Sequence, residues 1–202
     1  MAHRGIPEVV APYVLGGGIG AGKSTVLSEL ERLGFVVVQS DEIAHQVLLA
    51  RHPTGREAMA KWPSTVVDGE IDRSRLAAIV FNDAAELAAL EELTHPAIRE
   101  GINSAVTAAF DDDSARGVVV EIPLLRVMAE TPWRKIAVLA PTETRIDRAV
   151  ARGDTREDVV ARIGSQEPDE AWAEWADFIV DNGGSWEATQ EQILRIVEGP
   201  LR

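Results

Sequence analysis

Gly17-Gly18-Ile19-Gly20-Ala21-Gly22-Lys23-Ser24 is the most informative stretch of the 202-residue chain. It fits the pattern G-x-x-x-x-G-K-[ST], follows the short apolar run Tyr13–Leu15 and opens a predicted helix over Ser24–Leu33. A loop of this kind directs backbone N–H groups at phosphate oxygens, and the N-terminus of the next helix adds a partial positive charge. A chance glycine-rich turn is the alternative, and the flanking strand and helix argue against it. We therefore predict that Gly18–Thr25 binds the phosphates of a nucleotide.

Two side chains of this loop have predicted roles of their own. Lys23 would contact the β- and γ-phosphates, and the Ser24 hydroxyl would ligate Mg²⁺. The guanine-specific motif [NT]-K-x-D is absent, because the three lysines of the chain follow Gly22, Ala60 and Arg134. The loop thus indicates either a phosphoryl-transfer enzyme or an ATP-driven switch.

Working outward from the loop, further apolar runs alternate with helical stretches. The runs are continuous rather than alternating, which is typical of strands covered on both faces. They lie at Phe35–Val38, Val118–Ile122, Ile136–Leu139 and Phe178–Val180. Together with Tyr13–Leu15 they predict an α/β fold with a five-stranded parallel sheet, in a single domain over residues 10–202.

The middle of the chain, residues 50–110, shows no clear strand. Its windows Ser74–Phe81 and Ala84–Leu93 favour helices, with breaks expected at Asp68-Gly69 and His95-Pro96. We interpret this segment as a helical insertion after the second strand.

Composition narrows the choice of partners and location. Subtracting 33 acidic from 20 basic residues gives a net charge of −13, which argues against a nucleic-acid partner, whose phosphates demand cations. There is no cysteine, so disulfides and thiol catalysis are excluded. The first residues lack the apolar core of a signal peptide, and no apolar run is long enough to cross a membrane. We expect a cytoplasmic protein with no membrane attachment and no obligate protein partner.

Asp41 follows the second predicted strand by three residues. In open parallel sheets, ligands bind beyond the carboxyl ends of the strands. A carboxylate at that edge is suited to orient an acceptor hydroxyl and take its proton. The N-cap of the next helix is the other interpretation, since aspartate is common there.

Several motifs, taken in order, resemble the dephospho-CoA kinases along most of the chain. The family's G-G-I-G-S-G-K-S-T matches Gly17–Thr25, and its D-A-D-x-I-A-R resembles Gln39–His45. Its D-G-x-x-d-R-x-x-L, L-x-H-P-x-I and I-P-L-L match Asp68–Leu76, Leu93–Ile98 and Ile122–Leu125. Later family positions are matched by Arg148, Arg152, Arg162-Ile163, Gln166, Ala176-Asp177 and Asn182.

The resemblance implies a strand order of 2-3-1-4-5 and transfer of the γ-phosphoryl group of ATP, with Mg²⁺, to the ribose 3′-hydroxyl of dephospho-CoA. That reaction is the last step of coenzyme A biosynthesis. In this interpretation Asp41 is catalytic, and the insertion over 50–110 is the acceptor-binding subdomain. Acceptor contacts are implied for Asp41, Arg73, His95, Pro123 and Leu124. For His95, a plain helix start at His95-Pro96 is the competing interpretation.

Arg148 and Arg152 lie one helical turn apart and share a face. The resemblance places them as catalytic cations in a lid over residues 148–165, whereas a solvated basic face is the alternative. Glu121 ends the third predicted strand, where the family usually has aspartate. It is either a ligand of Mg²⁺ through water or an ordinary carboxylate at the end of a strand.

Three departures from the family pattern leave other functions open. Gly16 stands where family members usually have threonine, Gln39 where they have aspartate, and Arg126-Val127 where they have F-E. A related kinase acting on another nucleoside or small alcohol, or a nucleotide-binding protein without catalysis, would also fit these differences.

Overall fold

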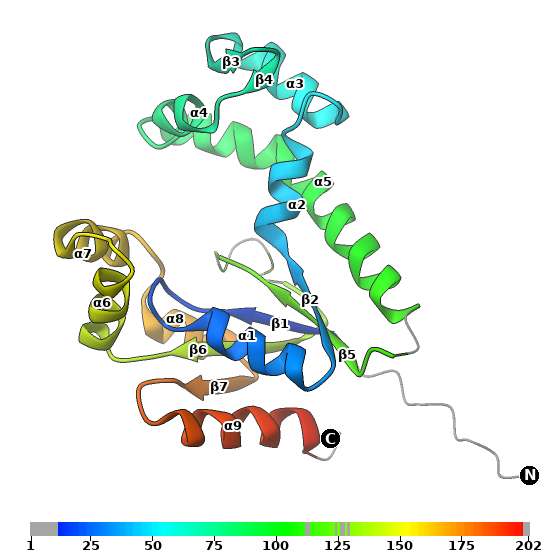
Figure 1. Cartoon of the computed structure of the whole chain (residues 1–202). Coiled ribbons are helices and arrows are strands. Elements are labelled where there is room, and N and C mark those ends of the chain that lie inside the picture. Colours follow the sequence, from blue (N-terminus) through cyan, green and yellow to red (C-terminus); the bar gives the residue numbers. More distant parts are fainter. Residues whose placement is uncertain (1–11, 112–113, 124, 126–127, 129, 200–202) are drawn as a thin grey trace, which may run out of the picture. The chain divides into compact units, whose positions relative to one another are not determined.

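The computed structural model describes residues 12–111, 114–123, 125, 128 and 130–199. By its internal contacts the chain divides into two units (Figure 1). The first unit contains the residues up to Val38 and those from Ala109 onward, and the second contains Gln39–Ala108. The first unit carries the predicted phosphate loop and the second lies in the middle of the chain, so we describe them in turn.

The first unit is built on a five-stranded parallel sheet, as predicted. Its spatial order is β2-β5-β1-β6-β7, which is the expected 2-3-1-4-5 when the strands of this sheet are counted along the chain. β1 pairs with β5 and β6, and β6 pairs with β7. The strands are β1 (Tyr13–Gly16), β2 (Phe35–Gln39), β5 (Gly117–Glu121), β6 (Arg134–Leu139) and β7 (Phe178–Asp181). Each overlaps one of the apolar runs in the sequence.

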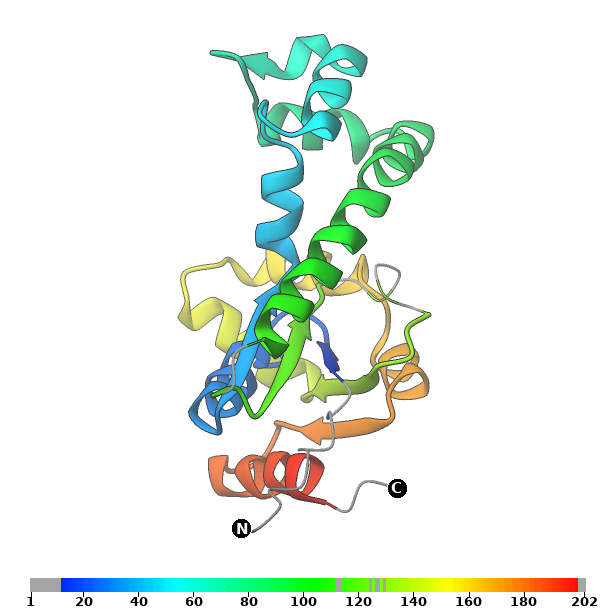
Figure 2. The same cartoon turned by 90° about the vertical axis from the view of Figure 1, so that its right-hand side faces the viewer.

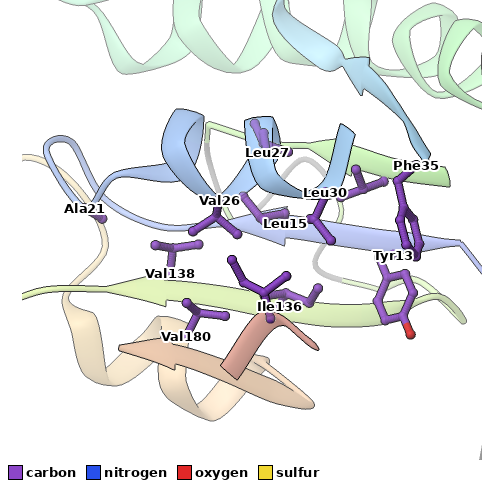
Figure 3. Close-up of a cluster of buried hydrophobic side chains, with 12 residues drawn as sticks. Tyr13, Leu15, Ala21, Val26, Leu27, Leu30, Phe35, Ile136, Val138 and Val180 are labelled. Atoms are coloured by element: carbon purple, nitrogen blue, oxygen red, sulfur yellow. The ribbon is translucent and has the colours of Figure 1, made fainter. Parts of the chain in front are cut away.

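One face of this sheet is covered by α1 (Lys23–Arg32) and α9 (Trp186–Glu198). Figure 3 shows Leu15, Val138 and Val180 of the strands pointing at the apolar side of α1. Val26 and Leu30 of α1 and Ile193 of α9 complete the buried cluster. Removal of these side chains from water stabilises the unit and fixes the start of α1, where the phosphate loop ends.

The other face is covered by α8 (Asp169–Trp175), which lies across the sheet from α1 (Figure 2). Side chains alternate between the two faces of a strand, so Gly16 faces α8 because Leu15 faces α1. A Cβ atom on Gly16 would lie 2.1 Å from Cζ3 of Trp172. Glycine therefore replaces the threonine expected here because the Trp172 ring fills the space of a side chain.

The first unit also contains a helical hairpin, α6 (Thr142–Ala151) and α7 (Arg156–Gly164). Its small core is formed by Ile146 and Ala149 packing against Val159. Thr155 caps α7, since its hydroxyl accepts a hydrogen bond from the N–H of Asp158.

The second unit is mostly helical. It contains α2 (Ser40–Val47), α3 (Pro53–Lys61), the 3₁₀ turn η1 (Pro63–Thr65), α4 (Arg73–Val80) and most of α5 (Ala84–Phe110). Trp62 is buried with Leu76 and Val80 in its core, and the Trp62 indole N–H donates to Glu86 at 2.8 Å. Asp72 caps α4 by accepting from the N–H groups of Ser74 and Arg75.

The expectation that residues 50–110 lack strands is wrong. Val66–Val67 (β3) and Glu70–Ile71 (β4) form an antiparallel pair. Asp68 and Gly69 between them both have positive φ, 52° and 82°, which is the conformation of a tight two-residue hairpin turn. Strands of two residues are too short to leave an alternating pattern in the sequence.

The break expected at His95-Pro96 is also wrong, because α5 continues from Ala84 to Phe110 with Pro96 inside it. Proline removes one intrahelical hydrogen bond and crowds the carbonyl four residues earlier, at a cost of about 3 kcal/mol. Beyond Pro96 the helix buries Ile98, Ile102 and Val106, and each such side chain contributes roughly 1.5–3 kcal/mol. Burial of this row of side chains outweighs the defect.

Among the described residues, no helix combines the length and the apolar character needed to cross a bilayer. The roles of residues 50–110 as an acceptor-binding subdomain and of 148–165 as a lid remain predictions.

Candidate active site

The phosphate loop connects β1 to α1 in the first unit. Gly20 and Gly22 have φ of 76° and 94°, a region that side chains other than glycine rarely adopt. Gly22 is the N-cap residue of α1 and has no side chain to cap it, so the first N–H groups of the helix face outward as anion donors. Lys23 Nζ donates to the Gly17 carbonyl at 2.9 Å, which folds the lysine across the loop.

Side chains from later in the chain hold the loop at two residues. The Ile19 carbonyl accepts from Arg145 Nε at 2.8 Å, and the Ile19 N–H donates to Gln166 Oε1 at 2.8 Å. The Ala21 carbonyl accepts from Asn182 Nδ2 at 2.9 Å and from Arg148 Nη1 at 3.3 Å. The conformation of the loop is therefore held by side chains from later in the chain as well as by its own backbone.

Of the two predicted lid arginines, only Arg148 contacts the loop in the described structure. Its Nη2 also donates to the Asn182 carbonyl at 2.8 Å, so it ties α6 to the end of β7. Arg152 follows the last residue of α6 and is exposed. Within the described part of the chain its side chain has no hydrogen bond or ion pair. Arg152 is thus a cation at the surface of the hairpin, one turn beyond Arg148.

Ser24 and Glu121 are the predicted magnesium residues, and both lie in the first unit. Ser24 is exposed in the first turn of α1. Glu121 ends β5 in register with Leu15, two residues before the loop, and the next N–H, of Ile122, donates to the Leu15 carbonyl at 2.9 Å. No group of three or more acidic, histidine or cysteine side chains converges on one point in the described residues. A hydroxyl and one carboxylate fit Mg²⁺, which binds few protein ligands and takes the rest from water and phosphates.

Asp41 and Arg73, two predicted acceptor residues, line the same hollow in the second unit. The hollow has a volume of about 640 Å³ and is also lined by Glu42, Ile43, His45 and Gln46. Asp41 is the second residue of α2 and is exposed, while Gln39 occupies the N-cap position without a side-chain hydrogen bond. The interpretation of Asp41 as the helix cap is therefore wrong, and its carboxylate faces solvent.

Of the other predicted acceptor residues, His95 belongs to the second unit and does not line this hollow. His95 lies inside α5, well past the helix start at Ala84, so a helix start at His95-Pro96 is wrong. Pro123 follows β5 in the first unit. Leu124 lies outside the described residues, as do the departures Arg126 and Val127.

Arg145 had no predicted role, and Asn182 and Gln166 were expected only as matches to a family pattern. A signal for Arg145 exists, because it lies three residues before Arg148 and thus on the same helix face. Its contact with Ile19 spans 126 positions in the chain. No local pattern predicts a contact of that range.

Comparison with known proteins agrees with this geometry. Residues 13–188 match the family model described as dephospho-CoA kinase. The chain is 36% identical to the dephospho-CoA kinase of Carboxydothermus hydrogenoformans over 94% of its own length and 95% of that protein. It is 39% identical to the enzyme of Deinococcus radiodurans over 89% and 87% of the two chains.

Solved structures show the same likeness. A crystal structure from Thermus thermophilus superposes with a TM-score of 0.82 at 34% identity, covering 96% of this chain and 100% of the other. The dephospho-CoA kinase of Campylobacter jejuni superposes with a TM-score of 0.67 at 27% identity, covering 93% of this chain and 95% of the other. A shikimate kinase of Acinetobacter baumannii, at 0.52 and 15% identity over 96% and 97%, shares the fold alone. With a phosphate loop, a parallel sheet of order 2-3-1-4-5 and relatives that match nearly end to end, the chain belongs to the dephospho-CoA kinase family.

Proposed function

We propose that this protein is a dephospho-CoA kinase, which transfers the γ-phosphoryl group of ATP to the ribose 3′-hydroxyl of dephospho-CoA in the last step of coenzyme A biosynthesis. The observation that carries the proposal is the phosphate loop, whose outer carbonyls are held by buried or half-buried side chains while the N-terminus of α1 stays uncapped. We also propose that the reaction takes place in the cytoplasm, where ATP is available.

ATP would bind to Gly18–Thr25 with its phosphates against the loop and the start of α1. Lys23, which contacts the Gly17 carbonyl in this structure, would move its ammonium group to the β- and γ-phosphates. Arg148 and Arg152 would offset the charge of the transferring group, because enzymes lower the barrier of such reactions chiefly by stabilising the charge that develops in the transition state. Closure of the α6–α7 hairpin would exclude the water that otherwise accepts the phosphoryl group.

Mg²⁺ would be held by the Ser24 hydroxyl and by Glu121 through water. The ion supplies charge neutralisation on the phosphate oxygens when it is bound.

In the second unit, the hollow lined by Asp41 and Arg73 would take the acceptor. The Asp41 carboxylate would orient the 3′-hydroxyl and accept its proton as the oxygen bonds to the γ-phosphorus. The bond from that phosphorus to the β–γ bridging oxygen breaks, so ADP and coenzyme A are the products. Arg73 would pair with a phosphate of the acceptor. His95, Pro123 and Leu124 would contact other parts of the acceptor.

The test is ADP release with MgATP and dephospho-CoA, compared with a panel of nucleoside monophosphates and shikimate. We expect turnover only with dephospho-CoA, and we expect Lys23→Ala to lose most of it while its circular dichroism spectrum stays unchanged. Preferential turnover of another alcohol would assign a different acceptor. ATP binding without turnover of any acceptor would indicate a nucleotide-binding protein, and normal turnover in Lys23→Ala would refute the role of the loop.

A further inference from the structure

Arg145 is a buried cation that lies against the phosphate loop. Its side chain is 4% exposed, and its Nη1 forms an ion pair with Asp169 Oδ1 at 2.6 Å. A guanidinium is stable in such a place only when it is paired and hydrogen-bonded. Asp169 supplies the opposite charge, and the Ile19 carbonyl accepts from Nε at 2.8 Å.

The third nitrogen of the guanidinium, Nη2, approaches the neighbouring residue of the loop. A Cβ atom on Gly18 would lie 2.1 Å from it, so the flat group rests directly on the backbone of Gly18. The guanidinium of Arg145 therefore contacts both the loop and Asp169. Gln166, three residues before Asp169, accepts from the Ile19 N–H.

The consequence for the loop follows from peptide geometry. The described residues contain no cis peptide bond, and in a trans peptide the C=O and the following N–H point in opposite directions. Because Arg145 holds the Ile19 carbonyl on the outer side of the loop, the Gly20 N–H turns to the inner side. Asn182 and Arg148 hold the Ala21 carbonyl in the same way and turn the Gly22 N–H inward.

We propose that Arg145, anchored by Asp169, is a positioning residue that sets the Gly20 N–H for binding ATP phosphates. It acts through the loop backbone and touches neither the transferring phosphoryl group nor the acceptor. Arg145 lies in α6 and Asp169 opens α8, so the pair also joins the loop to both ends of the α6–α7 hairpin. The inference rests on the proposed binding of ATP by Gly18–Thr25.

The first test is Arg145→Met, which keeps an unbranched apolar stem and removes the donors. Hydrogen bonds from charged groups are among the stronger ones, so we expect the Kd for MgATP, measured by calorimetry, to rise about 10-fold or more. The KM for ATP should rise with it, while kcat at saturating ATP stays within about 3-fold, because uniform binding is lost and not transition-state binding. Arg145→Lys keeps the positive charge but has a single donor nitrogen, so its Kd for MgATP should lie between those of the unmodified protein and Arg145→Met.

Arg195→Met is the matched control, since it removes an arginine of the same unit that lies outside the lid. Arg195 is exposed and pairs with Glu191 at 3.0 Å within α9, and exposed pairs contribute little. We expect its Kd and kcat to be unchanged. Asp169→Ala is a second, independent variant that leaves Arg145 in place without its anchor, and it should raise the Kd for MgATP by a smaller factor.

The outcomes separate the two proposals. If the unmodified protein does not bind MgATP, the proposed function fails. If it binds and both Arg145→Met and Asp169→Ala bind equally well, only the positioning role fails, even where their melting temperatures fall. A loss of kcat with unchanged Kd would also overturn it, because Arg145 would then act on the reaction itself. Should Arg145→Met not fold, Asp169→Ala and Arg145→Lys decide the question.

Discussion

Asp41 stands in the first turn of α2 with its carboxylate exposed, so it can be replaced without disturbing a core. Asp41→Asn keeps the shape and removes the charge. The charge interacts with the helix dipole by about 0.3–1 kcal/mol, which predicts only a small fall in melting temperature. If Asp41 takes the proton of the acceptor, kcat falls on the order of 10² to 10⁴.

The measurement is steady-state kinetics with ADP detection, together with calorimetry for MgATP. We expect the Kd for MgATP to stay within about 2-fold, since the loop is untouched. Glu42→Gln is the control, because it removes the adjacent exposed charge that lines the same hollow. Equal kinetics in Asp41→Asn and the unmodified protein would remove Asp41 from the mechanism.

At the scale of elements, α1 and α9 are joined by a buried polar contact beside their apolar one. Glu29 of α1 is buried, accepts from Arg32 Nε and Nη2 at 2.9 and 2.5 Å, and accepts from Gln190 of α9 at 3.3 Å. The hydrogen bonds from Arg32 lower the pKa of Glu29, with burial opposing and the charge of Arg32 and the bond from Gln190 assisting.

A pKa that is lower in the folded than in the unfolded protein makes the folded protein less stable as the pH falls. The contribution of Glu29 to stability is fully present above the ordinary glutamate pKa of about 4.3 and is lost as pH falls through its lower folded-state value. We predict that Glu29→Gln lowers the melting temperature at pH 7 and that the difference between the two proteins narrows below about pH 4. Glu191→Gln, at an exposed pair of α9 with Arg195, is the control. A difference that does not change with pH would rule out this linkage.

The α6–α7 hairpin is the element that we expect to move. Gly153, with φ of 106°, lies in its turn, and its internal core is small. Amides over residues 148–165 should therefore exchange faster than those of the sheet in the free protein and become protected when ATP and the acceptor are present. Equal protection with and without ligands would refute a lid.

Arg148→Ala tests the catalytic part of the same hypothesis. If its charge matters most in the transition state, kcat should fall by a larger factor than the Kd for MgATP rises. Arg148 also donates to the Ala21 and Asn182 carbonyls, so some loss of ATP binding is expected as well. An increase in Kd with unchanged kcat would make Arg148 a positioning residue like Arg145.

For the whole molecule, the two units are predicted to have different ligands. MgATP alone should slow exchange over residues 17–25 of the first unit, and dephospho-CoA alone should slow it over 41–46 and around Arg73 of the second. Hydrogen exchange with each ligand in turn measures this. Protection of the second unit by ATP alone, with none from dephospho-CoA, would contradict the assignment of the acceptor hollow.

Much of the first unit could be predicted from its sequence because the signals are local. The apolar runs mark the strands, and Gly34, with φ of 89°, ends the first helix as its type suggests. The second unit is harder to predict, because strands of two residues leave no pattern in the sequence. The energetic cost of Pro96 inside α5 is also outweighed by the burial of side chains farther along the helix, which the sequence alone does not show. The side chains that hold the loop come from positions more than 120 residues later, and only the folded chain brings them to it.

Gly16 and Trp172 constrain the order in which this protein can change over evolutionary time. A threonine at position 16 would overlap the Trp172 ring, so that substitution is accessible only after Trp172 has become smaller. Replacement of Trp172 can come first, because its buried indole N–H finds no acceptor among the described residues. Removing that unpaired donor offsets part of the stability that is lost with the buried ring. The two positions are therefore expected to change in a fixed order, and lineages with threonine at 16 should carry a smaller or more flexible residue at 172.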